Sequence, residues 1–480
     1  MVGGVLVAAL STGVGVVAFS TRGTGHATAI ASGPSVVTAS IPAPCARQTA
    51  PTSPPPKRTT ITTLQQAYHC ILAHYFRGPV LDDRRLLAAA FAGFTQELQR
   101  RGHDQPTATL AAFTGNRERD WAVFSAVYQQ VTSKLPADPR LRQALAAAAI
   151  QAMVASLDDN HAAWVRSLRP SGANPDDAYG LGIAGLSGVQ GTKADPAATP
   201  PLFVTSVLAE SPAARQGVRP GDVIVLVNGA SPFAGGVLAQ GVVDQLNPRY
   251  PQRQRVRLRW HRPATGRTWT AAITPARFQS ASPTVSAKLL RGEVAYLRLP
   301  GFFPGAADQA MGAIAGLRDG RTLGGVILDL RGIPGGAPAE VARLLGAFAH
   351  GEIIGYDCDV GGSCTPNRTD DTVPLLGLRL VALVDRACAS ACDAFSAAVK
   401  DLGLGTLVGT RTAGGVAGPA ASWLLDDNSL LRLPERHHLG PNKELINTIG
   451  VAADHHAPLT AEDLSSGRDP GLATALRLLP

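Results

Sequence analysis

The sequence predicts an α+β multidomain protein with a helical region, a β region and an alternating α/β region, in that order. Three observations support this fold class. Apolar residues recur at helical spacing from about residue 62 to 162, short apolar runs separated by turn residues fill about 176–278, and strands alternate with helices after about 286. At 480 residues the chain is too long for one ordinary domain. We expect boundaries at 61–170, 176–278 and 279–480.

The composition suits a globular protein with many loops. Hydrophobic residues make up 45% and charged residues 17%, with 51 glycines and 36 prolines. The net charge of +8 permits weak binding to anionic surfaces, but no block of Lys and Arg is interleaved with aromatic residues. We therefore expect no nucleic-acid partner.

The amino-terminal segment predicts export or anchoring. An unbroken apolar and small-residue run spans Val2 to Phe19, and a Ser/Thr/Pro-rich stretch continues to about Thr60. We interpret 1–30 as a signal peptide or a membrane anchor, two alternatives that stay open, and 31–60 as a linker. Either alternative places most of the chain outside the cytoplasm, secreted or membrane-anchored.

The six cysteines fit an oxidising compartment. Cys358 and Cys364 share one predicted loop, while Cys388 and Cys392 bracket Ser390. Cys388 and Cys392 pair either with each other or with the loop cysteines, and the spacing does not decide between these alternatives. The spacing does not suit zinc, and we expect no metal and no cofactor.

The helical region ends in cap and turn residues that carry a histidine. Amphipathic stripes run from Leu64 to Tyr75, over 86–98 and over 141–157, and then Ser156 to Trp164 interrupts the pattern. His161 lies at this helix end, where a side chain can reach another domain. The alternative is a surface or capping histidine.

The β region resembles a PDZ domain of the bacterial protease type. Gly180-Leu181-Gly182-Ile183 is followed by strands, by Ser211-Pro212, and by a Gly-Val-Arg-Pro-Gly-Asp turn at 217–222 that leads into Val-Asn-Gly. The resemblance implies that the backbone N–H groups of Gly180, Leu181, Gly182 and Ile183 bind a peptide carboxylate, beside a strand edge that accepts a peptide. The insert 188–200 lengthens the first hairpin.

The α/β region contains a serine at a strand-to-helix turn. A buried-type strand over Leu378–Val384 precedes Ser390, and helix formers follow from Ala391 to Asp401. Such a turn exposes the hydroxyl near the free N–H groups of a helix's first turn. Ser390 is therefore a candidate nucleophile, and a simple N-cap is the alternative. Another strand ends in Gly332-Ile333-Pro334-Gly335-Gly336, whose glycines permit a close backbone approach.

The three regions together resemble the carboxy-terminal processing, or tail-specific, serine peptidases and their tricorn-core relatives. The motifs are Leu-Asp-Leu-Arg at 328–331 with Pro-Gly-Gly, Ala389-Ser390-Ala391, Gly409 to Gly414, and Gly-Val-Ala-Ala-Asp at 450–454. The resemblance implies a core related to ClpP and crotonase. It also implies that Ser390 is the nucleophile and that the amides of Ala391 and of Gly335 or Gly336 form the oxyanion hole.

The general base departs from the best-known branch of this family. Its members place a lysine where this sequence has Gly415, and Arg411 stays protonated at any useful pH. Similarity to the tricorn-core branch implies His161 as the base and Glu444 as the carboxylate that orients it. By the same resemblance Asp401 matches an acidic position. We interpret Asp401 and Lys400 as structural, with Lys400 facing solvent.

Two functions from different classes follow. The first is an exported serine endopeptidase that acts on protein or peptide substrates held by the PDZ-like region. The second is an inactive peptide-binding or scaffold protein that lost the lysine at position 415. A third reading, a small-ligand binder on a crotonase-like core, lacks a phosphate or nucleotide loop to support it.

Overall fold

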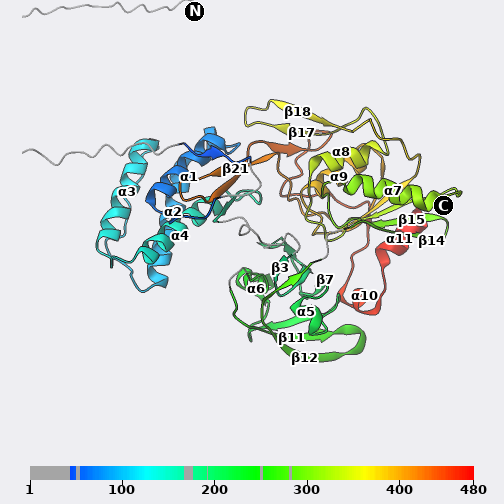
Figure 1. Cartoon of the computed structure of the whole chain (residues 1–480), viewed down its shortest axis with the longest axis horizontal. Coiled ribbons are helices and arrows are strands. Elements are labelled where there is room, and N and C mark those ends of the chain that lie inside the picture. Colours follow the sequence, from blue (N-terminus) through cyan, green and yellow to red (C-terminus); the bar gives the residue numbers. More distant parts are fainter. Residues whose placement is uncertain are drawn as a thin grey trace, which may run out of the picture. The chain divides into compact units, whose positions relative to one another are not determined.

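The computed structural model describes residues 44–49, 54–166, 177–191, 193–248, 252–280 and 284–479 (Figure 1). The expected signal or anchor and most of the linker lie outside these residues. Residues 42–480 group into one compact unit. Within the described ranges, no helix is both long enough and apolar enough to cross a bilayer.

Four helices form the amino-terminal region. They are α1 (Ile61–His74), α2 (Asp83–Arg100), α3 (Arg117–Ser133) and α4 (Pro139–Ala155). Each begins after a residue whose side chain accepts a hydrogen bond from the first turn, which satisfies otherwise free N–H groups: Thr60, Asp82, Asn116 and Asp138. Their apolar faces enclose one core that includes Tyr68, Phe94 and Phe124.

A four-stranded antiparallel sheet joins this helical region to the carboxy-terminal region. Its strand order is β1 (Ala46–Arg47), β21 (Ala420–Leu424), β22 (Leu430–Pro434) and β2 (Ala163–Val165). Leu431 and Leu433 of β22 are buried in the core of the four helices. This pairing holds the residues just before β2 against the carboxy-terminal region.

The β region consists of several small sheets with two short helices, α5 (Pro212–Arg215) and α6 (Gln240–Leu246). Its larger sheet has the order β12 (Arg267–Ile273), β11 (Val256–Arg262), β8 (Val223–Val227). Two-stranded ladders pair β3 (Asp177–Gly180) with β13 (Ala276–Gln279), and β4 (Ile183–Leu186) with β7 (Val204–Val207). Short hairpins β5–β6 (Val189–Gln190, Lys193–Ala194) and β9–β10 (Phe233–Ala234, Val237–Leu238) complete it. Trp260 is fully buried in the centre.

A six-stranded sheet forms the centre of the α/β region. Its order is β14 (Ser286–Leu290), β15 (Val294–Arg298), β16 (Gly325–Asp329), β19 (Leu380–Val384), β20 (Gly405–Gly409) and β24 (His455–His456). All strands are parallel except β14 at one edge. Every residue of β16 and β19 is buried, as expected for strands covered on both faces.

Helices cover both faces of this sheet. α7 (Ala306–Arg318), α8 (Pro338–Gly346) and α9 (Ala391–Asp401) enclose one apolar core, and α11 (Pro470–Leu478) covers the other face. α10 (Ala461–Ser466) precedes α11. A second sheet, with the order β18 (Cys364–Arg368), β17 (Ile353–Cys358), β23 (His437–Leu439), lies beside the helices (Figure 1). The predicted α+β multidomain class is confirmed, while the three boundary positions stay predictions.

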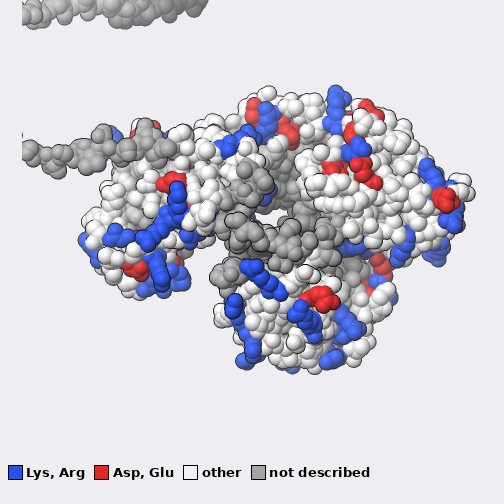
Figure 2. Space-filling view, in the orientation of Figure 1, with Lys and Arg blue, Asp and Glu red and all other residues white. Residues whose placement is uncertain are grey.

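The six cysteines form three disulfides. The bonds join Cys45 to Cys70, Cys358 to Cys364, and Cys388 to Cys392. The alternative left open by the spacing is thus resolved: the two cysteines around Ser390 pair with each other. On the face drawn in Figure 2, Lys and Arg stand in short groups with Asp and Glu among them.

Candidate active site

Ser390 occupies the turn between β19 and α9 in a strained backbone conformation. Its φ of 57° and ψ of −117° lie outside the regions that L residues prefer. Gly335 packs directly against this turn, because a Cβ placed on Gly335 would lie 2.6 Å from the Ser390 Cβ. The loop after β16 and the serine turn therefore fit together only with glycine at position 335. Ser390 is at the N-cap position, yet its hydroxyl faces the imidazole of His161.

His161 reaches Ser390 from the end of the helical region. Its Nε2 lies 3.3 Å from Ser390 Oγ, although 229 positions separate the two residues. The backbone N–H of His161 donates to Asp159 Oδ1 (2.8 Å), whose other oxygen accepts from Tyr75 OH (3.0 Å). Burial lowers the pKa of His161 below its usual 6.5, and the nearby Arg432 lowers it further, while Asp159 opposes both.

The second ring nitrogen of His161 contacts Asn160. Nδ1 lies 2.6 Å from Asn160 Oδ1. A carbonyl oxygen can only accept, so Nδ1 carries the proton and Nε2 presents a lone pair to Ser390.

Glu444, the residue expected to orient His161, lies elsewhere. Its carboxylate accepts from Asn442 N (2.9 Å), and burial with the neighbouring Asp401 raises its pKa. The orienting contact at Nδ1 is therefore made by Asn160, the residue that precedes the histidine.

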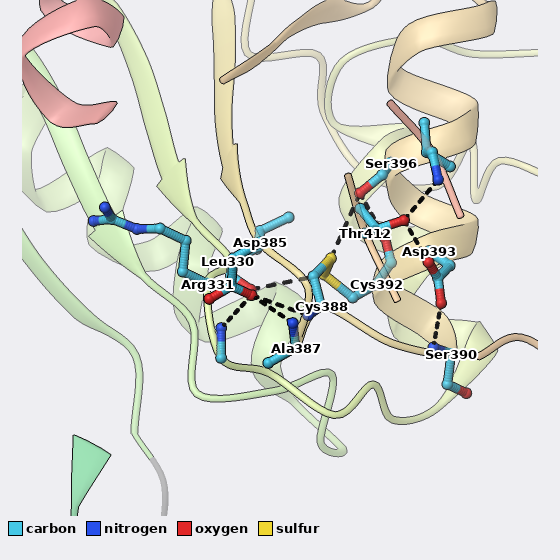
Figure 3. The surroundings of a disulfide bond; sticks show 12 residues. Leu330, Arg331, Asp385, Ala387, Cys388, Ser390, Cys392, Asp393, Ser396 and Thr412 are labelled. Atoms are coloured by element: carbon cyan, nitrogen blue, oxygen red, sulfur yellow. Dashed lines mark hydrogen bonds between the residues drawn. A yellow bond between two sulfur atoms is a disulfide. The ribbon is translucent and has the colours of Figure 1, made fainter. Parts of the chain in front are cut away.

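Asp393 connects the serine turn to the 412–415 turn. This fully buried carboxylate accepts hydrogen bonds from Ser390 N, Gly414 N and Gly415 N, each at 2.9 Å, and from the Thr412 hydroxyl. Burial raises the pKa of Asp393, and the four donors oppose that rise. Figure 3 shows Asp393 between Ser390 and Thr412, next to the Cys388–Cys392 disulfide.

Asp385 connects the glycine loop that begins at Gly332 to the residues just before Ser390. Its Oδ1 accepts from Gly332 N (3.0 Å), Ala387 N (3.0 Å) and Cys388 N (3.1 Å), which ties the glycine loop to the strand that leads to Ser390 (Figure 3). Desolvation raises the pKa of this carboxyl. Carboxylates thus fix the turns on both sides of the serine.

A cleft of about 470 Å³ opens at Ser390 and His161. Gly336 and Ala391, two of the expected oxyanion-hole residues, line the same cleft. The remaining wall is largely apolar, with Val341, Ala342, Ile354, Ala394 and Val416. Ala391 is the first residue of α9, where N–H groups have no acceptor within the helix. An N–H group that lacks an acceptor next to a serine hydroxyl can stabilise a negative oxygen.

The position of the absent lysine lies against Asn160. A Cβ added to Gly415 would lie 3.0 Å from Asn160 Nδ2. The side-chain space that a lysine at position 415 would enter is therefore bordered by the Asn160–His161 pair. Arg411 is bound to a different group, because its guanidinium donates to Gly450 O (3.1 Å).

The expected peptide-binding residues of the β region surround a small second pocket. Gly180, Leu181, Gly182 and Ile183 line a hollow of about 180 Å³ that also includes Leu246 of α6. β4 pairs with β7 only, among the described strands, so its other edge is unpaired, and Ile183 at its start lines the hollow. The hollow thus lies at the start of a free strand edge and includes the apolar side chains of Leu246 and Phe278.

The insert of the β region touches the candidate active site. Asp195 of this insert is buried and forms an ion pair with Arg386 (2.7 Å), four residues before Ser390. Gln190 Nε2 donates to Ala413 O (3.4 Å) in the 412–415 turn.

Sequence reasoning missed Asn160 and Asp393, and it misplaced Lys400. Asn160 is one position from the selected histidine, and Asp393 lies three residues after a serine at a helix start, a spacing that signals a reciprocal cap. Lys400 was expected to face solvent, but its Nζ donates to Ala452 O and Asp454 Oδ1, both at 2.8 Å. Lys400 holds α9 to the segment that precedes β24.

Known proteins share both the sequence motifs and the fold. A family model for peptidase family S41 matches residues 293–457, and one for the PDZ domain matches residues 176–233. The chloroplastic C-terminal processing peptidase of Tetradesmus obliquus is 30% identical over 341 residues, 67% of this chain and 69% of that protein. The carboxy-terminal processing protease CtpB of Bacillus subtilis is 24% identical over 352 residues, 72% of this chain and 70% of that protein. The solved photosystem II D1 C-terminal processing protease has the same fold, with a TM-score of 0.52 at 22% identity over 87% of this chain and 96% of that one.

Proposed function

Because the chain belongs to peptidase family S41, as its motifs predicted, we propose that it is an exported serine endopeptidase that acts through an acyl-enzyme on Ser390. One observation carries the proposal: the 3.3 Å between His161 Nε2 and Ser390 Oγ. A serine hydroxyl needs a neighbouring base with a pKa near neutral, and a neutral imidazole at hydrogen-bond distance meets that need.

The first half of the proposed reaction forms the acyl-enzyme. Ser390 Oγ attacks the carbonyl carbon of the peptide bond while its proton moves to His161 Nε2. The carbonyl oxygen becomes negative and accepts from the N–H groups of Ala391 and of Gly335 or Gly336. The tetrahedral intermediate then collapses, the C–N bond breaks, and His161 gives its proton to the leaving amine.

The second half uses the same groups with water. His161 Nε2 accepts a proton as a water oxygen attacks the acyl carbon, and the proton returns to Ser390 Oγ when the ester bond breaks. In both halves Asn160 Oδ1 accepts a hydrogen bond from the Nδ1–H of His161, so that Nε2 stays the reacting nitrogen. Asn160 is neutral, so it orients the ring without the added charge stabilisation of a carboxylate.

The β region supplies the proposed hold on the substrate. A carboxylate at the end of a peptide binds the N–H groups of Gly180 to Ile183, and the preceding residues add a strand beside β4. Proteins and peptides are accordingly the proposed substrates.

Export is supported by the cysteines. All six are paired in the described residues, and disulfides persist in oxidising compartments outside the cytoplasm. The apolar run at Val2–Phe19 is the proposed signal or anchor.

The alternative function is an inactive peptide-binding scaffold, which the glycine at position 415 favours. An assay of peptide-bond hydrolysis distinguishes the peptidase from the scaffold. The purified chain is incubated with unfolded casein at pH 7.5, and new peptide termini are identified by mass spectrometry. We expect products with the wild type and none with Ser390→Ala. Equal products from both, or none from either, would leave the scaffold as the better account.

A further inference from the structure

The cleft at Ser390 contains a positively charged side chain that the proposed mechanism does not use. Arg432 lines this cleft from β22. The strand alternates, so that Leu431 and Leu433 are buried among the helices while Arg432 is exposed on the opposite face. In the sheet register Arg432 lies opposite Ala163, two residues after His161.

Arg432 has no hydrogen-bond or ion-pair partner among the described residues. Two carboxylates of the site are held by other groups. Asp357, which lines the cleft, pairs with His438 Nδ1 (3.0 Å), and Asp159 accepts from His161 N and Tyr75 OH. A guanidinium that is left unpaired beside a reactive centre is open to an anion from outside.

The kind of anion that Arg432 can bind depends on the molecule that enters this cleft. The proposed function puts a peptide there, and the anionic groups of a peptide are carboxylates. Resting on that function, we infer that Arg432 is a specificity-determining residue that binds a carboxylate of the substrate, from either an Asp or Glu side chain near the cleaved bond or a nearby free carboxy terminus.

The other arginine of the cleft differs from Arg432 in having a protein partner. Arg368 also lines it, but its guanidinium donates to Gly351 O (3.4 Å). The apolar wall suits the substrate side chain next to the cleaved bond, so the charge acts at a neighbouring position. An exposed charge-assisted hydrogen bond changes binding by about tenfold.

The test uses internally quenched decapeptides with one apolar core, in which Glu, Gln or Lys replaces single residues on either side of the cleaved bond. Each peptide is made as a free acid and as an amide. We expect the wild type to cleave one Glu peptide, or one free acid, about tenfold faster in kcat/KM than its Gln or amide counterpart. A Glu preference identifies a side chain, and an acid preference identifies the carboxy terminus.

Variants of the two arginines then identify the residue that causes the preference for a carboxylate. Arg432→Gln should bring the ratio to about one, and Arg432→Glu should favour the Lys peptide instead. Arg368→Gln removes the same charge from the same cleft and should leave the ratio unchanged. No preference in the wild type, a preference that survives in Arg432→Gln, or equal loss in Arg368→Gln would overturn the inference.

Binding separates this inference from the proposed function. The same peptides are titrated by fluorescence anisotropy against Ser390→Ala, with and without Arg432→Gln. Tighter binding of the Glu or free-acid peptide, lost with Arg432→Gln, supports the inference even if the wild type cleaves nothing. Equal binding of all peptides by Ser390→Ala would contradict it even if the wild type is an active peptidase.

Discussion

Replacing Asp393 by Asn should destabilise the protein and slow any chemistry at Ser390. The carboxylate is fully buried and accepts from three backbone N–H groups and one hydroxyl. Asparagine has the same shape, but its NH₂ group must take the place of one oxygen. At that place it would face two donors, such as the N–H groups of Ser390 and Gly415, where it cannot accept from either.

The magnitude follows from the lost contacts. Two buried N–H groups without an acceptor cost about 1–3 kcal/mol each, so we expect a loss of about 3 kcal/mol in the free energy of unfolding. The strained φ of Ser390 depends on this anchor, and a displacement of about 1 Å at a nucleophile costs about 100-fold in rate.

Two measurements follow for Asp393→Asn. Urea denaturation gives the free energy, with Asp319→Asn at an exposed position as the control expected within about 0.5 kcal/mol of the wild type. The rate of labelling by a fluorophosphonate reports the serine. A variant within about 1 kcal/mol of the wild type that also labels at the wild-type rate would refute the account of the turn.

Four further predictions concern the base and its surroundings. Because His161 must be neutral to accept a proton and burial lowers its pKa below 6.5, kcat/KM should fall with decreasing pH around a midpoint under 6.5; a midpoint above 7 would contradict this. Arg432→Gln, leaving Asp159 in place, should move that midpoint upward in the same titration. Asn160→Ala should lower kcat about 10- to 1,000-fold with KM nearly unchanged, while an unaltered kcat would remove Asn160 from the mechanism. Gly415→Ala should also lower kcat, because its Cβ would lie 3.0 Å from Asn160 Nδ2, whereas Gly241→Ala, with open space around it, should have no effect.

Much of the α/β region could be predicted because its signals are local. The helix after Ser390 was expected from Ala391 to Asp401 and has those bounds, since a strand, a turn and a helical pattern follow one another without a gap. Strands β16 and β19 were expected from their continuous apolar residues, which is how strands covered on both faces read in a sequence.

The antiparallel sheet that brings His161 to Ser390 could not be predicted. β2 is three residues long and pairs with β22, which lies more than 260 positions later, and neither strand carries a signal for its partner. The resemblance to known peptidases implied His161 as the base. It did not identify the side chain that orients His161, because that contact depends on where each side chain lies in the folded protein. Both Asn160 and Glu444 carry an oxygen that can accept from a ring N–H, and only the folded backbone places one of them at Nδ1.

The central claim is that His161 activates Ser390, and fluorophosphonate labelling tests it most directly. The wild type, Ser390→Ala and His161→Ala are labelled under identical conditions at pH 7.5, and the modified peptide is identified by mass spectrometry. We predict a label on Ser390 in the wild type, none in Ser390→Ala, and labelling at least about 1,000-fold slower in His161→Ala. Equal labelling rates for the wild type and His161→Ala would contradict the account.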